Sequence, residues 1–252
     1  MSDLNAVRRR YAEEIRDVLK ARFGMALSKP LVDAFGKVSR EHFLGPGPWV
    51  VRRIKKNIRG RFTCWLHRSD PIDDTTTADP EHLYRHDAIV AIDVSRGLNN
   101  GQPSGLASWI QLLELRRGDR VLHVGCGVGY YTAIMAEVVG PTGQVIGIEI
   151  DPGLAARACQ NLTYLEHVKI VHGDGGEYVA GPTDAIFVNA GTTHPRRAWL
   201  DSLQLGGRLI IPLTTENGRG AVLSVKCGSR GYAARFVSLP RSSIVWAVGT
   251  KS

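Results

Sequence analysis

One stretch limits the possible folds more than any other: VLHVGCGVGYYT, residues 121–132. Its apolar start is typical of a buried strand, its three glycines predict a turn, and YYTAIMAEVV, residues 130–139, predicts a helix. This order places the glycines at the carboxyl end of a strand, where open α/β sheets bind ligands. Because glycine has no side chain, backbone N–H groups there can approach a ligand closely.

Short β-rich runs alternate with helical ones in the rest of this half, which predicts a doubly wound, mostly parallel, Rossmann-like α/β sheet. After Gly218, AVLSVKC and AARFVSL predict two added strands, separated by a turn around Gly228 and Gly231. The strands of the main sheet are expected near 120–125, 144–149, 168–172, 184–189 and 207–212.

The amino-terminal third has a different character. Apolar residues at helical spacing predict helices over 4–20 and 30–38, whereas residues 45–85 are rich in Gly, Pro, Asp and Thr. With 252 residues, 43% of them hydrophobic, the chain suffices for one buried core. We therefore expect a single domain, 1–252, whose parts are a helical region (1–44), an irregular insertion or lid (45–86) and a catalytic core (87–252).

Composition narrows the class of protein. The apolar runs are much shorter than the roughly 20 residues of a membrane span, and no apolar signal region opens the chain. Four scattered cysteines lack the spacing of a zinc site. We expect a soluble, cytoplasmic protein without a metal. The cysteines are Cys64, Cys126, Cys159 and Cys227.

A net charge of +8 favours an acidic partner without identifying it. VVRRIKKNIRGR, residues 50–61, holds six basic residues and no acidic one. No aromatic residue is interleaved for stacking on bases, so a solvated loop face is favoured over a nucleic-acid site.

The glycine spacing indicates the cofactor. A dinucleotide site has G-x-G-x-x-G, whereas here Tyr130 fills the slot of the third glycine, which is evidence against NAD. Glu149 ends the next strand and can accept hydrogen bonds from both hydroxyls of a ribose. Asp174 follows the third strand, where a carboxylate can accept from an adenine amino group. Together these signals suit an adenosyl ligand that lacks a pyrophosphate.

Further motifs follow in order: LLELRRGDRVLHVGCGVGYYTAI, GQVIGIEIDP, HGDG, DAIFVNAG and LQLGGRLIIPL. From about Val38 to Val237 the chain resembles the class I S-adenosylmethionine-dependent methyltransferases, specifically the protein-L-isoaspartate O-methyltransferase group. The resemblance implies S-adenosyl-L-methionine as the cofactor, with Gly125, Gly127 and Gly129 at the methionine end, Glu149 at the ribose and Asp174 near the adenine. Asn189, at the end of the fourth strand, is a further candidate for cofactor binding.

His123 departs from this family, which has an acidic residue at the same place. One interpretation is a histidine satisfied by neighbouring backbone, and the other is a changed contact to the methionine ammonium group. A neutral imidazole can accept a hydrogen bond from that group, whereas a protonated one repels it. We therefore expect the affinity for the cofactor to fall at low pH.

The segment expected to bind the methyl acceptor also differs from the family pattern. The isoaspartyl enzymes carry T-I-S-x-P, whose serine orients the substrate carboxylate, and here GLNNGQPSG, residues 97–105, has Gly101 in the serine's place. Asn99 and Asn100 can bind a carboxylate through their amide N–H groups, although Asn-Asn-Gly is also an ordinary turn sequence. Gln102 and Ser104 are further candidates for substrate contact.

VNAGTTHP, residues 188–195, supplies the remaining candidates. Thr192 and Thr193 are expected at the acceptor. His194 is a general base, a carboxylate partner or simply the residue before a helix that starts at Pro195.

The cofactor's sulfonium already activates the methyl group, so the enzyme has to align a nucleophile and exclude water. An ionised carboxylate needs no base, whereas a hydroxyl acceptor needs one, for which His194 is the candidate. The leading hypothesis is a carboxyl O-methyltransferase acting on an isoaspartyl or peptide carboxylate or on a small acid, with weak turnover of isoaspartyl peptides because the serine is missing.

Three alternatives stay open. The first is a small-molecule hydroxyl methyltransferase. The second is a nucleic-acid methyltransferase, against which the fourth strand lacks the Pro-Pro-aromatic element of enzymes that methylate base amino groups. The third is a cofactor-binding protein without catalysis.

Overall fold

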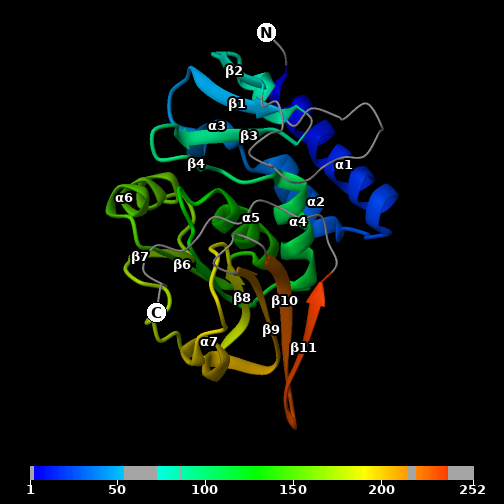
Figure 1. Ribbon diagram of the computed structural model, residues 1–252. Coiled ribbons are helices and arrows are strands. Elements are labelled where there is room, and N and C mark those ends of the chain that lie inside the picture. The colour runs from blue at the N-terminus through cyan, green and yellow to red at the C-terminus, as the bar shows by residue number, and fades with distance from the viewer. Residues whose placement is uncertain (1–2, 54–72, 86, 215–219, 238–252) are drawn as a thin grey trace. The chain divides into compact units, whose positions relative to one another are not determined.

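The computed structural model describes residues 3–53, 73–85, 87–214 and 220–237 (Figure 1). It divides into two compact units, of which the first runs to Ser108 and the second begins at Trp109. Each unit has its own β-sheet.

Three helices open the first unit. Asp3 caps α1 by accepting a hydrogen bond from the N–H of Asn5, and Gly24 ends the helix in a left-handed conformation, φ 61°. Both helices predicted in this region, 4–20 and 30–38, are confirmed, with α1 three residues longer than expected. The bounds are Leu4–Phe23 (α1), Lys29–Lys37 (α2) and Arg40–Leu44 (α3).

A four-stranded antiparallel sheet, in the order β2-β1-β3-β4, follows these helices. Val51 of β1 lies opposite Thr75 of β2 and Val90 of β3, so β-branched residues pair across three strands. This pairing corrects the expectation of an irregular insertion, since the described part of residues 45–86 contains two strands and a short helix. The elements are β1 (Trp49–Arg53), β2 (Asp73–Thr77), the 3₁₀ helix η1 (Pro80–Tyr84), β3 (Ile89–Asp93) and β4 (Leu98–Asn99).

The second unit contains a seven-stranded sheet in the order β11-β10-β9-β8-β5-β6-β7. The five strands from β9 to β7 are parallel, and β10 and β11 are antiparallel additions. This confirms the predicted mostly parallel sheet with two added carboxyl-terminal strands. The strands are β5 (Arg120–Val124), β6 (Gln144–Glu149), β7 (Val168–His172), β8 (Thr183–Val188), β9 (Leu203–Thr214), β10 (Gly220–Gly228) and β11 (Gly231–Val237).

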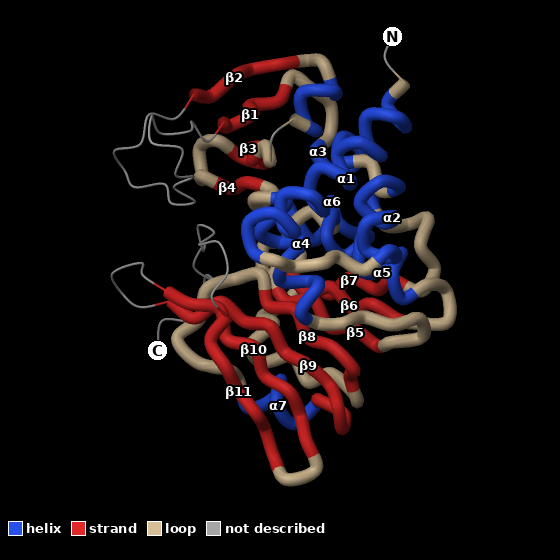
Figure 2. The backbone as a smooth tube through the Cα atoms, turned by 90° about the vertical axis from the view of Figure 1, so that its right-hand side faces the viewer, coloured by secondary structure: helices blue, strands red, loops and turns tan. Residues whose placement is uncertain are grey.

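Helices cover both faces of this sheet, with α5 and α6 on one side and α7 on the other (Figure 2). The chain leaves β5 through α5 and α6 toward β7, and it proceeds from β8 through α7 in the opposite direction. The direction therefore reverses between β5 and β8, and open α/β sheets bind ligands at the carboxyl ends of the strands at such a reversal. The helices are α4 (Pro103–Leu112), which crosses the boundary between the units, α5 (Tyr130–Val139), α6 (Pro152–Asn161) and α7 (Arg197–Ser202).

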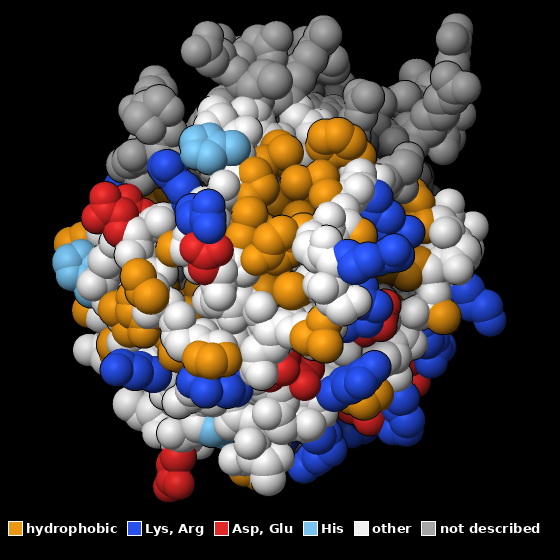
Figure 3. Space-filling view, turned by 90° about the horizontal axis from the view of Figure 1, so that it is seen from below, with side chains coloured by type: hydrophobic (Ala, Val, Ile, Leu, Met, Phe, Trp, Pro, Cys, Tyr) orange, Lys and Arg blue, Asp and Glu red, His pale blue; other side chains and the backbone are white. Residues whose placement is uncertain are grey.

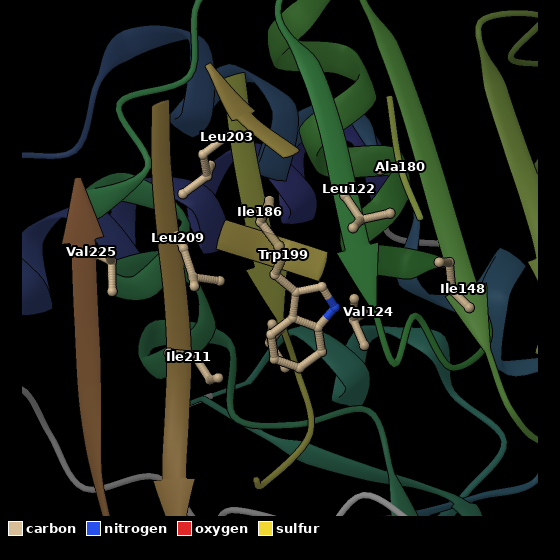
Figure 4. Packing of buried hydrophobic residues seen from close by; sticks show 11 residues of the cluster. Leu122, Val124, Ile148, Ala180, Ile186, Trp199, Leu203, Leu209, Ile211 and Val225 are labelled. Carbon is tan, nitrogen blue, oxygen red and sulfur yellow. The ribbon is translucent and has the colours of Figure 1, made fainter. Parts of the chain in front are cut away.

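Trp199 of α7 anchors the core on the α7 face of the sheet. Trp199 is 2% exposed and packs in one cluster with Val124, Ile186 and Leu209 (Figure 4). A buried side chain of this size contributes several kcal/mol by the usual measure of apolar burial. The sheet therefore gives the strand ends a rigid support.

Candidate active site

The glycine turn between β5 and α5 has three residues in left-handed conformations, φ 74°, 57° and 93° at Gly125, Gly127 and Gly129. A Cβ atom on Gly129 would lie 2.7 Å from Cδ1 of Leu162, so this glycine is needed for packing. A Cβ on Gly127 would have no atom within 4 Å. Gly127 therefore borders open space, as a residue that admits a ligand does.

Glu149, at the end of β6, is 7% exposed and holds this turn in place. Its Oε2 accepts a hydrogen bond from the N–H of Gly127 at 2.7 Å, and Oε1 accepts from the N–H of Asp151 at 3.0 Å. A carboxylate oxygen can accept two hydrogen bonds, so with respect to the described residues each oxygen of Glu149 keeps one free position. Glu149 is therefore able to accept from two ribose hydroxyls without releasing the turn.

Asp174 follows β7 in a turn that packs on the end of β5. Its Oδ1 accepts from the N–H of Gly176 at 2.7 Å, and a Cβ on Gly175 would lie 2.5 Å from Cγ1 of Val124. The indole N–H of Trp199 donates to the carbonyl of Gly175 at 2.7 Å. Sequence reasoning missed this support, because Trp199 lies 24 positions further along the chain and carries no motif.

Asn189 follows β8, and its backbone N–H donates to the carbonyl of Val124 at 2.8 Å. The cofactor residues predicted from sequence thus lie at the carboxyl ends of neighbouring parallel strands. The open space at Gly127, the free acceptor positions of Glu149 and the start of α5 fit S-adenosylmethionine, whose ammonium, carboxylate and ribose need such partners. The individual roles stay predictions.

The structure corrects the backbone interpretation of His123 and leaves the cofactor interpretation a prediction. His123 is fully buried, its Nδ1 lies 2.8 Å from Oγ1 of Thr132, and its ring lies 5.2 Å from that of Phe187. Its partner is therefore a side-chain hydroxyl and not backbone, and Nε2 is buried without a hydrogen-bond partner among the described residues. A contact of Nε2 with the cofactor stays a prediction.

Burial lowers the pKa of His123 to about 3. The folded protein therefore keeps this ring neutral through the ordinary acidic range. This corrects the expectation that protonation of His123 weakens cofactor binding in the ordinary acidic range.

Residues 97–105, the acceptor turn, belong to the first unit. Within this turn the side-chain oxygens of Asn99 and Asn100 both accept hydrogen bonds from backbone N–H groups. Oδ1 of Asn99 accepts from the N–H of Gly101 at 2.9 Å, and Oδ1 of Asn100 accepts from the N–H of Val90 at 2.9 Å. Asn100 also donates its backbone N–H to Val90 at 2.9 Å. The two amide oxygens therefore stabilise the turn, as the turn interpretation predicts. Because these hydrogen bonds fix the amide planes, they also orient the NH₂ groups that would bind a carboxylate. Asn99 is the more accessible of the two, because Asn100 is 7% exposed.

Gly101 has φ 72°, which is a left-handed conformation. A serine at this position would be strained by about 1–2 kcal/mol. The turn is therefore built around glycine, and the family's serine has no direct equivalent in it.

Gln102 and Ser104 both bind Asp87, a residue that sequence reasoning missed. Nε2 of Gln102 donates to Asp87 at 2.5 Å, the N–H of Ser104 donates at 2.7 Å, and the hydroxyl of Ser104 donates as well. These contacts give both side chains a positioning part, and direct contact with a substrate stays a prediction. Asp87 comes just before β3, so its proximity to the start of α4 follows only from the fold.

The segment after β8 contains the remaining candidates. Thr192 is 1% exposed, and its hydroxyl donates to the carbonyl of His194 at 2.8 Å, which occupies this side chain within its own loop. Thr193 and His194 are exposed, with Oγ1 and Nδ1 2.9 Å apart. Their acceptor and base roles stay predictions.

The basic run 50–61 lies largely outside the described residues. Of its described part, Arg52 pairs with Asp74 through Nε and Oδ1 at 3.0 Å. On the face of the molecule seen from below, the described Lys and Arg side chains are spread out, with Asp and Glu between them (Figure 3). Among the described helices, none combines the length and apolar character needed to cross a bilayer.

Comparison with known sequences gives one consistent family. Residues 79–236 match the family model described as "Protein-L-isoaspartate(D-aspartate) O-methyltransferase (PCMT)". A protein-L-isoaspartate O-methyltransferase 1 from Archaeoglobus fulgidus is 35% identical over 188 residues, which cover 69% of this chain and 87% of the relative. The enzyme of that name from Methanopyrus kandleri is 39% identical over 177 residues, which cover 65% and 78%.

Solved structures share the fold. One named protein-L-isoaspartate O-methyltransferase has a TM-score of 0.66 at 24% identity, covering 95% of this chain and 67% of that one. A putative enzyme of the same name from Plasmodium falciparum, in complex with S-adenosyl-L-homocysteine, has a TM-score of 0.58 at 19% identity, covering 95% and 98%.

Proposed function

The chain belongs to the protein-L-isoaspartate(D-aspartate) O-methyltransferase family, and on that premise we propose that it methylates the free carboxylate of isoaspartyl residues in peptides and proteins. It is an S-adenosylmethionine-dependent methyltransferase. The observation that carries the proposal is the extent of the family match, because residues 79–236 include the candidate acceptor turn as well as the strand ends that would form the cofactor site.

The cofactor supplies a methyl group that its sulfonium already activates. An isoaspartyl carboxylate is ionised near neutral pH, so no side chain of the enzyme has to remove a proton. The protein itself has to hold the cofactor and orient the acceptor carboxylate. The glycine turn, Glu149 and Asp174 would bind the cofactor, and the NH₂ groups of Asn99 and Asn100 would direct the carboxylate oxygens.

The asparagines support this substrate despite the missing serine. Each amide oxygen already accepts one backbone N–H, whereas the described residues give the two NH₂ groups no partner, so the donors are the less committed groups of these side chains. Donors suit an anion that accepts hydrogen bonds, and they suit a neutral hydroxyl less well.

The test uses labelled S-adenosylmethionine and three versions of one peptide, containing isoaspartate, aspartate or asparagine at the same position. We expect label only in the isoaspartyl peptide, and mild alkali should release it as methanol because the product is an ester. Label that survives alkali would indicate a hydroxyl acceptor instead. Absence of transfer to all three peptides would contradict the proposed substrate.

A further inference from the structure

One face of the four-stranded sheet in the first unit carries a shallow hollow. Side chains two positions apart on a strand point to the same face, and here these are Val50 and Arg52 of β1 and Ile89 and Ala91 of β3. The intervening residues Val51 and Val90 are 3% and 0% exposed. The hollow therefore lies on the face opposite the one that Val51 and Val90 bury.

The lining of this hollow combines apolar and charged side chains. Val50, Ile89 and Ala91 are here called its apolar floor, within which Ile89 is 4% exposed. On the β2 side, Arg52 makes a two-pronged contact with Asp74, Nε to Oδ1 at 3.0 Å and Nη2 to Oδ2 at 3.2 Å, which neutralises the arginine.

Asp93 lines the hollow at the end of β3. Its Oδ1 accepts from the hydroxyl of Ser95 at 2.6 Å and from the N–H of Arg96 at 3.2 Å. The Ser95 contact is the main cause that holds the pKa of Asp93 below its ordinary value, and the charge of Arg96 is the smallest contribution. With one arginine against two aspartates, the lining has an excess of negative charge in a chain of net charge +8.

The acceptor turn borders the same hollow. Asn99 is one of the lining residues and pairs with Ala91 across β3 and β4. A carboxylate bound to the Asn99 amide would therefore lie within a residue or two of the apolar floor. This proximity connects the hollow to the substrate.

We propose that this hollow is a subsite for a lysine or arginine side chain that flanks the isoaspartyl residue of the acceptor peptide. The alkyl stem packs on Val50, Ile89 and Ala91, and the charged end reaches Asp93. Such side chains commonly bury their stem and leave the charge at the surface. The inference rests on the proposed function, because it assumes a peptide that places its carboxylate at Asn99.

The test compares four isoaspartyl peptides that differ only in the flanking residue: lysine, norleucine, glutamine or glutamate. The expected order of kcat/KM is lysine, norleucine, glutamine, glutamate. An exposed ion pair gives a preference of about two- to fivefold for lysine over norleucine. Burial of even one methylene gives norleucine about fourfold over glutamine.

Two variants separate the contribution of the charge from that of the apolar floor. Asp93→Asn keeps an oxygen for Ser95 and Arg96 and should abolish the preference for lysine over norleucine while leaving that for norleucine over glutamine. Ala91→Leu fills the floor and should reduce both. Glu14→Gln, on the exposed side of α1, is the matched control and should leave the order unchanged.

Calorimetry of the same peptides in the presence of S-adenosylhomocysteine measures the order independently of turnover. Equal dissociation constants for the lysine and glutamate peptides would overturn the subsite, whether or not methyl transfer occurs. An intact order of binding without transfer would contradict only the proposed function.

Discussion

Asp87 accepts hydrogen bonds from both the backbone N–H and the hydroxyl of Ser104, in the first turn of α4. N–H groups in the first turn of a helix have no partner within the helix, so Asp87 caps α4 from a distant part of the chain. Asp87 itself has φ 62°, a conformation that aspartate and asparagine adopt more readily than most residues. One carboxylate thus fixes the end of the acceptor turn and the start of the helix.

Asp87→Ala should lower the free energy of unfolding by about 2 kcal/mol, because it leaves the buried donors of Ser104 without an acceptor. Asp87→Asn keeps one oxygen and tolerates the same φ, so its effect should be about half as large. Urea unfolding measures both, with the exposed Glu14→Ala as the control. An alanine variant as stable as the native protein would show that this cap is energetically unimportant.

Asn99→Asp tests the acceptor turn without changing its shape. The aspartate retains an oxygen for the N–H of Gly101, but it replaces the NH₂ donors with a second negatively charged oxygen. The KM for an isoaspartyl peptide should rise at least about tenfold, since charge-assisted hydrogen bonds contribute about 1.5–3 kcal/mol. The dissociation constant of S-adenosylmethionine serves as the internal control and should stay constant. An unchanged KM would remove Asn99 from the acceptor site.

Glu149→Gln tests the ribose contact. It retains one acceptor oxygen, so part of the support for Gly127 and Asp151 remains, whereas charge-assisted acceptance from ribose is lost. We expect cofactor binding to weaken at least about tenfold by calorimetry. A dissociation constant equal to that of the native enzyme would contradict the assignment, provided that thermal unfolding shows an intact fold.

The glycine turn provides a matched pair of substitutions. Gly129→Ala brings a Cβ within 2.7 Å of Leu162 at φ 93°, so the fold itself should be destabilised. Gly127→Ala meets no atom within 4 Å and adds only the left-handed strain of about 1–2 kcal/mol, while its methyl group enters the open space. Gly127→Ala should therefore lose cofactor affinity with less loss of stability than Gly129→Ala. The reverse order in unfolding experiments would show that the space at Gly127 is not open.

The seven-stranded sheet could be predicted from the sequence because its central strands β5, β6 and β8 are compact apolar runs and helical segments separate them along the chain. The four-stranded sheet could not, since β1 and β2 are short and polar threonines and aspartates form much of β2. β1 and β2 pair only through tertiary contact, and a segment rich in Gly, Pro, Asp and Thr gives no indication of such a pairing.

The same distinction applies to the site. Gly127 and Glu149 could be identified from the sequence because Gly127 lies in the glycine turn that follows β5 and Glu149 is the last residue of β6. The residues that support other parts of the site carry no local signal: Trp199 at the Asp174 turn, Thr132 at His123 and Asp87 at the acceptor turn. They are brought into contact by packing, and their residue types are also common in structural roles.

His123 allows a prediction about pH. Its pKa is about 3 in the folded protein and about 6.5 in the unfolded chain, so the unfolded chain binds one more proton between these values. Stability must therefore fall as the pH is lowered below about 6.5, and the loss from this residue alone reaches about 2 kcal/mol at pH 5.

His123→Phe removes the titrating group and preserves an aromatic ring beside Phe187. Urea unfolding at pH 7 and pH 5 should show a smaller loss for this variant than for the native protein, because the carboxylates contribute equally to both and cancel in the difference. Cofactor affinity of the native protein should meanwhile show no step attributable to His123 over the same range, since the folded ring stays neutral. Parallel stability losses in the two proteins would mean that His123 is solvated and titrates normally, which would also reopen a direct effect of its protonation on the cofactor.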